Sequence, residues 1–338
     1  MARRAGLLLV LALTACTGTP PQPDPVRASA EAFLARYVDP DGRVVRRDQG
    51  GDTVSEGVSY AMLLAQVTGD RETEREVWEW ARAHLVRPDG LLSYLAGPDG
   101  EVLDEQAATD ADLAVAWALG RSSQSELRAQ AAPLIAAVRE HTVVDRRPGP
   151  LLAAGPWATG EPATLNPSYW VLPALRATGL DAEAAAVAPA LDALGSPLPP
   201  DWARQDGDVL RVSADPGGRF PEPRYGLDAQ RTTVWLATDC DPANRARAAA
   251  LRPLLTDRPE AVARRLDGTV LDPAAHPLGL VAAAAAADAD GDDAARDDLL
   301  DRAAAQDQRS PGYYGSAWVA LGRALLQGDV LDDCPGVP

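Results

Sequence analysis

The chain has 338 residues, of which 32 are basic and 49 acidic, and its net charge at neutral pH is −17. All 32 basic residues are Arg, and the absence of Lys excludes Schiff-base chemistry and a P-loop. The negative charge argues against nucleic acid or an anionic membrane surface as the main partner, because phosphate groups are bound by clustered positive charge. Alanine tracts and a total of only two Phe residues favour helix over sheet.

The N-terminus has the pattern of a bacterial lipoprotein signal. A short basic segment precedes the apolar stretch 6–13, which is too short to span a bilayer, and Leu-Thr-Ala-Cys then ends at Cys16. This sequence resembles a lipobox, so we predict a signal peptide over 1–15, lipidation of Cys16 and a Pro- and Thr-rich tether over 16–25. The mature chain would be held on the extracellular face of a cell membrane. An ordinary secretory signal, with Cys16 present by chance, is the alternative.

Helical periodicity dominates the rest of the chain. In the first segment, apolar residues from Val26 to Tyr37 recur at helical spacing and form a single stripe. The same reasoning predicts helices near 26–37, 53–68, 71–85, 109–120, 124–140, 167–178, 181–194, 226–238, 242–255, 276–287, 292–305 and 311–327. Pro133, Pro173, Pro189 and Pro253 fall inside these ranges, and each removes a backbone hydrogen bond.

The predicted helices are of two kinds. The odd-numbered helices, such as 71–85, are amphipathic, whereas the even-numbered helices carry few charges beyond their first turn and are apolar nearly all round. Most of the even-numbered helices also follow long loops. Six buried helices that alternate with six exposed ones predict an all-α fold, the (α/α)6 barrel, in which the inner helices are parallel and the long loops gather at one end. We therefore predict a single domain over 26–338.

Three acidic residues lie at the starts of even-numbered helices: Glu56, Asp110 and Asp228. If the inner helices are parallel, all three carboxyl groups face the same mouth of the barrel. Glycosidic hydrolysis needs such a group of carboxyls, because a protonated one donates to the leaving oxygen while an ionised one activates water on the opposite face of the sugar.

A structural role for the same acids is the alternative. Thr53-x-x-Glu56 and Thr109-x-x-Asp112 both fit a capping box, and acids in a first turn are favoured by the helix dipole. The dipole also opposes catalysis, because it lowers the pKa of a carboxyl that a general acid needs to keep high. Burial, or repulsion by Asp110, would have to outweigh the dipole at Glu56.

Six segments carry a combined pattern in chain order: 53–64 (TVSEGVSYAMLL), 87–92 (RPDGLL), 108–113 (ATDADL), 165–169 (LNPSY), 228–231 (DAQR) and 313–314 (YY). Together they resemble the motifs of glycoside hydrolase family 8, over about residues 26–327. The resemblance implies the (α/α)6 barrel and an inverting mechanism. It also implies that Glu56 is the proton donor, that Asp228 is the base, and that Asp110 holds the sugar at the cleavage point.

Other residues near these motifs are candidates for contact with the substrate. Arg231 follows Asp228 by three residues, so an ion pair would help to keep that carboxylate charged, and a plain structural salt bridge is an equal alternative. Tyr169, Tyr225 and Asp112 lie at the predicted mouth and are candidates to bind the sugar or orient the base. For the two Tyr residues, packing is an equal alternative.

The eight Trp residues divide by position. Trp157 and Trp202 lie on predicted loops at the mouth and are candidate platforms for sugar rings. The Trp residues within the even-numbered helices are predicted to fill the core: Trp117, Trp170, Trp235 and Trp318. Those of helix 71–85, Trp78 and Trp80, are predicted to pack in the core or at the surface.

The sequence offers little for metals or cofactors. The three His residues are far apart and lack ligand spacing, and the acidic turn 288–293 lacks the terminal Glu of a calcium loop. We therefore predict no metal and no cofactor. Cys240 and Cys334 form an even pair that could be a disulfide in an oxidising compartment, although the sequence does not place them within bonding distance.

The pattern departs from the family around the acids. Val58 stands where Gln is usual, Ala61 where Gly is usual, and Leu227 where an aromatic residue is usual. These departures put the substrate in doubt more than the chemistry. We predict a monomeric inverting hydrolase of β-1,4 bonds in a glucan such as cellulose, with xylan, chitosan or mixed-linkage glucan as neighbouring substrates. The alternatives are a carbohydrate-binding surface lipoprotein without turnover and a tethered scaffold for envelope assembly.

Overall fold

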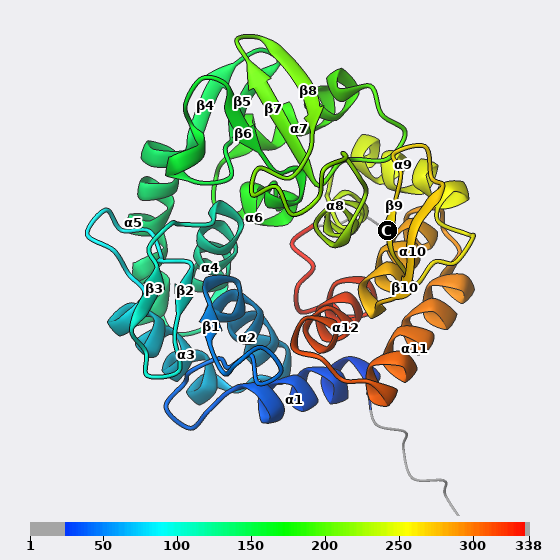
Figure 1. The fold of residues 1–338 in the computed structure, drawn as a ribbon. Helices are drawn as coiled ribbons and strands as arrows, with labels where there is room; N and C mark the ends of the chain where they lie inside the picture. Colours follow the sequence, from blue (N-terminus) through cyan, green and yellow to red (C-terminus); the bar gives the residue numbers. More distant parts are fainter. Residues whose placement is uncertain (1–23, 335–338) are drawn as a thin grey trace, which may run out of the picture.

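The computed structural model describes residues 24–334 and places their helices in two concentric rings (Figure 1). The inner helices are α2 (Ser55–Thr68), α4 (Thr109–Arg121), α6 (Leu172–Ala177), α8 (Leu227–Ala237), α10 (Pro277–Ala289) and α12 (Tyr313–Leu326). The outer helices are α1 (Pro25–Tyr37), α3 (Arg71–His84), α5 (Ser125–Thr142), α7 (Asp181–Leu194), α9 (Pro242–Leu251) and α11 (Asp293–Arg309). Each inner helix contacts the next, and α12 closes the ring against α2. The predicted (α/α)6 barrel is confirmed.

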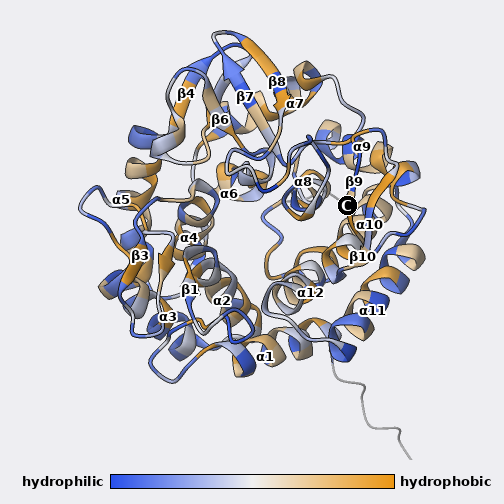
Figure 2. Cartoon of the chain, in the orientation of Figure 1, coloured by the Kyte–Doolittle hydropathy of each residue, from blue (hydrophilic) through white to orange (hydrophobic). Residues whose placement is uncertain are grey.

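Hydropathy explains which helices lie inside (Figure 2). In α10 every residue from Pro277 to Ala287 is buried, so this helix is apolar on all sides. The outer helix α3 instead buries only one stripe, which includes Val77, Trp78 and Ala81, and exposes its charges. Asp24 caps α1 by accepting the Val26 amide (3.0 Å), so this helix begins one residue before its predicted start. The predicted signal peptide, Cys16 and residues 16–23 of the predicted tether lie outside the described residues.

One predicted inner helix is broken. The range 167–178 contains the 3-10 turn η2 (Pro167–Tyr169), an irregular link and then the short α6. The cause is Pro173, which has no amide hydrogen and so cannot lie in the interior of a helix that continues from η2. It is tolerated in the first turn, where that amide is not needed, and α6 therefore starts at Leu172. Pro253 similarly ends α9 at Leu251, and the 3-10 turn η3 (Arg252–Leu254) follows.

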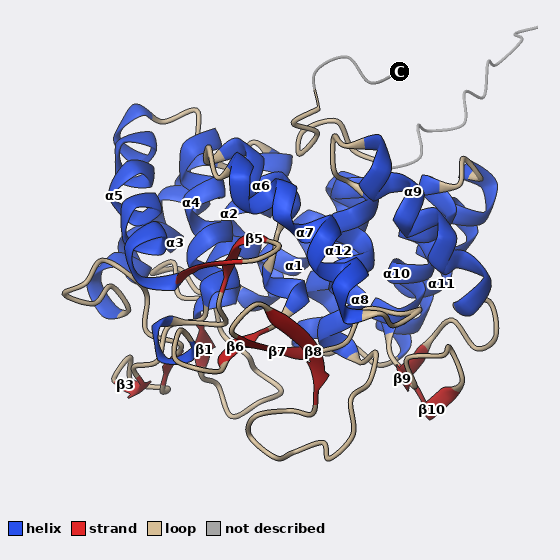
Figure 3. Cartoon of the chain, turned by 90° about the horizontal axis from the view of Figure 1, so that it is seen from above, coloured by secondary structure: helices blue, strands red, loops and turns tan. Residues whose placement is uncertain are grey.

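Short antiparallel strands, which the sequence did not predict, join the loops that precede the inner helices. Most of them lie on one side of the helical rings (Figure 3). They form four small sheets: β1 (Thr53–Val54), β2 (Leu95–Ala96) and β3 (Val102–Asp104); β4 (Val143–Arg146) and β5 (Gly149–Leu152); β6 (Ala163–Leu165), β7 (Trp202–Asp206) and β8 (Val209–Ser213); β9 (Ala261–Arg264) and β10 (Val270–Ala275). In the third sheet Trp202 pairs with Ser213, and Leu165 pairs with Ala203. The sheets fix the loops at the mouth of the barrel.

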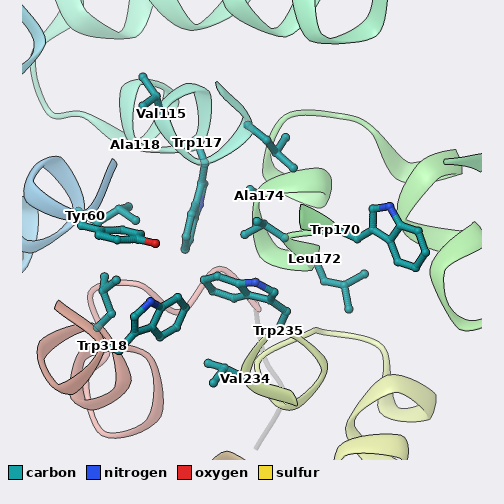
Figure 4. Packing of buried hydrophobic residues seen from close by; sticks show 14 of the residues in the cluster. Tyr60, Val115, Trp117, Ala118, Trp170, Leu172, Ala174, Val234, Trp235 and Trp318 are labelled. Carbon is teal, nitrogen blue, oxygen red and sulfur yellow. The ribbon is translucent and has the colours of Figure 1, made fainter. Parts of the chain in front are cut away.

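Aromatic side chains fill the centre of the barrel (Figure 4). Trp235 and Trp318 contact each other at 5.4 Å between ring centroids, and Tyr60 meets Trp318 at 6.0 Å. Trp117 points toward the same centre, whereas Trp170 is turned away from it and donates from Nε1 to the Leu152 carbonyl (2.9 Å). All four inner Trp side chains are buried, as predicted, and so are Trp78 and Trp80 on α3.

The C-terminal segment crosses the end of the barrel opposite the mouth. Cys240, which follows α8, forms a disulfide with Cys334, with 5.2 Å between their Cα atoms. Asp333 accepts a hydrogen bond from Trp117 Nε1 (2.6 Å) and also pairs with Arg121, both on α4. The disulfide that the sequence left open is therefore present in the structure, and it ties the α8–α9 turn to the last described residues.

None of the helices over residues 24–334 has the length and hydropathy of a transmembrane span. That part of the chain also contains no group of His, Cys, Asp or Glu side chains suited to a metal ion. In the acidic turn, Arg252 pairs with Asp290 and Asp292, and Arg296 pairs with Asp288 (3.0 Å), so Arg side chains neutralise the carboxylates.

Candidate active site

The three predicted carboxyl groups occupy the second residue of α2, the second residue of α4 and the second residue of α8. The capping boxes do not form. The N-cap positions are Val54 and Ala108, neither of which makes a side-chain cap. Thr109 Oγ1 instead donates to the Ala153 carbonyl (2.7 Å), and Thr53 Oγ1 accepts from Arg43 Nε (3.0 Å). Glu56 and Asp112 therefore do not form the capping boxes that their spacing suggested.

Arg231 is the centre of the site. Its Nη1 donates to Asp110 Oδ2 at 2.6 Å, and its Nη2 contacts Asp228 Oδ1 at 3.2 Å. Nη2 also donates to Ser168 Oγ (2.8 Å). The guanidinium is 5% exposed, so its charge is held among these acceptors with little competition from water. The predicted ion pair with Asp228 is present, but the shorter bond is to Asp110, which joins α4 to α8.

The turn before α6 completes the network. Asn166 caps η2 by accepting the Ser168 amide at 3.0 Å, and its Nδ2 donates to Asp228 Oδ2 at 3.2 Å. Ser168 Oγ donates to Asn166 Oδ1 (2.7 Å), and Trp235 Nε1 donates to the Ser168 carbonyl (3.0 Å). Both oxygens of Asp228 therefore have a donor, while its side chain stays 35% exposed toward the mouth.

The surroundings of Glu56 favour its protonated form. Burial, followed by the negative charge of Asp110, raises the pKa of Glu56 to about 7. Its own backbone amide, Arg231 and Arg46 oppose this rise but are outweighed. Burial also raises the pKa of Asp110, against the effect of Arg231. The helix dipole is expected to lower the pKa of Glu56 and burial to raise it. Burial has the larger effect, so Glu56 can hold a proton near neutral pH.

Aromatic residues line the approach to the carboxyl groups. The ring of Tyr169 lies 5.5 Å from the Arg231 guanidinium, and Trp202 meets Tyr169 edge to face with 6.2 Å between ring centroids. Trp157 is 44% exposed and donates from Nε1 to the Ala107 carbonyl at 3.2 Å, which fixes the indole at the surface. Tyr169 and Trp202 therefore lie beside Arg231, and Trp157 lies beside the residues before α4, while contact of these three side chains with a sugar chain stays a prediction.

Two predicted substrate contacts are wrong. Tyr225 is 1% exposed, and its hydroxyl shares a hydrogen bond with Thr233 Oγ1 (2.9 Å), so it packs inside the barrel behind α8. Asp112 is fully buried and accepts the Leu92 amide at 2.8 Å, so it anchors the preceding loop. Tyr225 lies three residues before Asp228 and outside α8, and Asp112 lies two residues after Asp110. Their side chains therefore point in different directions from those of the two acids, and both are buried away from the mouth.

Some residues near the acids gave no signal in the sequence. The charge of Glu56 is the largest cause that raises the pKa of Tyr94. The charge of Arg46 works to lower the pKa of both Tyr94 and Glu56. Arg46 is held by Asp52 through bonds of 2.7 and 2.6 Å. These residues come from loops without periodicity, so only the folded chain identifies them. Asn166 did carry a signal, because Asn before Pro is a common helix start.

The family departures lie in packing positions. Val58 and Ala61 are buried on α2 and face the core. Leu227 is partly buried and packs against the hydrophobic core. These substitutions leave the network of Arg231 with Asp110 and Asp228 intact. Glu56 can act as an acid, Asp228 has both oxygens hydrogen-bonded, and Asp110 is paired with Arg231. These groups can together carry out acid and base chemistry on one substrate.

Comparison with known proteins agrees with this geometry. Glycosyl hydrolases family 8 matches residues 4–322 of the chain. A probable endoglucanase of Novacetimonas hansenii is 32% identical over 65% of this chain and 60% of its own, and an endoglucanase of Cellulomonas uda is 31% identical over 61% and 62%. The matched segments thus span about three fifths of these relatives.

A solved structure matches over a longer range. The endo-β-1,4-glucanase CMCax of Acetobacter xylinum is 27% identical, with a TM-score of 0.73 over 90% of this chain and 100% of its own. The match of the family pattern to most of the sequence and this agreement in fold lead to one conclusion. The chain belongs to glycosyl hydrolase family 8.

Proposed function

We propose that the chain is an inverting glycoside hydrolase that cleaves internal β-1,4 bonds of a glucan such as cellulose. The observation that carries this proposal is the meeting of three carboxyl groups at one mouth, one of which, Glu56, favours its protonated form. Glu56 has a pKa of about 7 and so retains a proton, whereas Asp228 faces the mouth with both oxygens held by donors. The relatives named above as endoglucanases support the choice of substrate.

The mechanism follows from these positions. Protonated Glu56 donates its proton to the glycosidic oxygen as the bond from that oxygen to the anomeric carbon breaks. A water molecule attacks the same carbon from the opposite face and gives a proton to Asp228, so the anomeric configuration inverts. Asp110, held by Arg231, accepts hydrogen bonds from the sugar at the cleavage point. Solvent then returns a proton to Glu56 and removes one from Asp228.

A glycan panel read out by released reducing ends tests the proposal. We expect the wild type to cleave a soluble cellulose derivative, and both Glu56→Gln and Asp228→Asn to lose at least about 100-fold in kcat, the scale of positioned acid–base catalysis. Xylan, chitosan and mixed-linkage glucan in the same panel define the substrate range. A folded wild type that cleaves none of these glycans contradicts the proposal, and one that still binds them supports the carbohydrate-binding alternative.

We also propose that the chain is a monomer held at the extracellular face of a membrane by lipid on Cys16. The support is the lipobox-like sequence that ends at Cys16. Expression with Cys16→Ala in a bacterial host should move the protein from the detergent phase to the aqueous phase in detergent partitioning. Light scattering of the domain from residue 24 onward should give the mass of one chain. Equal partitioning of both proteins contradicts the lipid anchor.

A further inference from the structure

The first turn of α8, which carries the proposed base, is capped from a distant loop. Its N-cap residue is Gly226, which has no side chain to accept the free amides at the start of the helix. The outer helices α3, α9 and α11 instead have an Asp at the N-cap position whose side chain accepts an amide of the same helix: Asp70, Asp241 and Asp292. The inner helix therefore depends on another part of the chain for this function.

Asp201 provides the missing acceptor. Its Oδ1 accepts the amides of Gly226 (2.9 Å) and Ala229 (2.8 Å), which flank Asp228 in the chain. Its Oδ2 accepts from Arg224 Nε (3.0 Å), and its own amide donates to the Arg224 carbonyl (2.8 Å). Asp201 is 5% exposed, so the three bonds to its carboxylate and the one from its backbone amide hold it against the start of α8.

Close packing makes this arrangement specific. A Cβ atom on Gly226 would lie 2.4 Å from Asp201 Oδ2, so only glycine allows the carboxylate to approach the helix. The next residue, Trp202, contacts Tyr169, whose ring lies beside the Arg231 guanidinium. Burial, followed by the charge of Asp228, raises the pKa of Asp201 to about 6, so the two carboxyl groups are close enough to influence each other.

We propose that Asp201 is a positioning residue that sets the place of Asp228 by capping the first turn of α8 through the Gly226 and Ala229 amides. This inference rests on the proposed function, in which Asp228 is the base. Asp201 acts through the backbone, since its carboxylate accepts the Gly226 and Ala229 amides on either side of the base. A shift of about 1 Å in such a group is enough to lower a rate 100-fold.

The test compares two substitutions at Asp201 with a matched control. We expect Asp201→Ala to lower kcat about 10- to 100-fold while KM changes less than about threefold. Asp201→Asn keeps an oxygen acceptor in the same place, so it should recover kcat to within about fivefold of the wild type. The control is Asp70→Ala, which removes the cap of α3 far from the site and should lower the melting temperature without changing kcat.

A second variant guards against misfolding of Asp201→Ala. Gly226→Ala keeps the Asp201 carboxylate but displaces it, so it should show the same loss in kcat. Unchanged kcat in a folded Asp201→Ala or Gly226→Ala protein overturns the proposal. An Asp201→Asn protein as slow as Asp201→Ala also overturns it, because the loss would then come from the charge and not from the cap.

Hydrogen exchange separates this inference from the proposed function. Amide exchange in residues 226–229, followed by mass spectrometry, needs no substrate. It should be at least about tenfold faster in Asp201→Ala than in the wild type, and unchanged in Asp70→Ala. If the wild type cleaves no glycan, the proposed function fails, and exchange still decides whether Asp201 caps the helix. Unchanged exchange in Asp201→Ala overturns the cap itself.

Discussion

At Glu56, burial and the neighbouring Asp110 charge act against the field of α2, and burial has the larger effect. The same residue type at the start of an exposed helix would be stabilised as the anion by the dipole. The sequence could place Glu56 at the helix start, but it could not give the sign of the pKa shift, because that sign depends on how much water the folded barrel removes. The chemistry of the site is therefore set at the scale of one buried carboxyl group.

This shift predicts the pH dependence of activity. The general acid must be protonated, and the protonated fraction of Glu56 falls as pH rises through its pKa of about 7. We expect kcat/KM to decline above about pH 7 with a slope of one proton. Asp110→Asn removes the second cause of the shift, so its residual activity should decline at a lower pH. A profile that stays flat to pH 9 in the wild type contradicts the assignment of Glu56 as the acid.

The same shift predicts an effect on stability. Because the pKa of Glu56 is raised from 4.5 to about 7 on folding, the folded state binds more protons between these values, and stability falls as pH rises through this window. Glu56→Gln has no charge to bury, so it should melt at a higher temperature than the wild type at pH 8 and at a similar temperature at pH 4. Scanning calorimetry at the two pH values measures this. Equal differences at both pH values contradict it.

At the scale of elements, periodicity predicted eleven of the twelve helices within a few residues, because each has a buried stripe or is buried on all sides. It failed at 167–178, where Pro173 and the capping by Asn166 divide the range. It also missed the strands, since runs of two to six residues have too few alternations to be recognised. The broken segment is the one that brings Asn166 and Ser168 to Asp228 and Arg231.

Contact between inner helices predicts opposite effects for two glycines. A Cβ atom on Gly322 in α12 would lie 2.5 Å from Val281 of α10, so Gly322→Ala should destabilise the protein by about 1–3 kcal/mol. The matched control is Gly120→Ala on the exposed side of α4, where the nearest atom would be 3.9 Å away. Helix propensity alone should there stabilise by about 0.5–1 kcal/mol. Urea unfolding measures both, and equal effects would contradict tight packing at Gly322.

For the whole molecule, the disulfide joins positions 94 residues apart, so it closes a large loop in the unfolded chain. Loop entropy alone corresponds to about 4–5 kcal/mol. We expect the Cys240→Ser, Cys334→Ser double variant to melt about 5–15 °C below the wild type. A reducing agent should lower the wild type to the same temperature and leave the double variant unchanged. A melting temperature that is the same in both proteins would show that the bridge contributes nothing.

The all-α class, the alternation of inner and outer helices, and the three acids at the inner-helix starts could be predicted from the sequence, because hydrophobic periodicity and helix signals are local properties. Which residues meet depends on the folded chain. It placed Arg231 between Asp110 and Asp228, turned Tyr225 and Asp112 away from the mouth, and brought Asp201 to the start of α8. These contacts join residues up to 121 positions apart, and no local pattern records them. Burial and distance, which raise the pKa values of Glu56 and Asp110, exist only once the ring has closed.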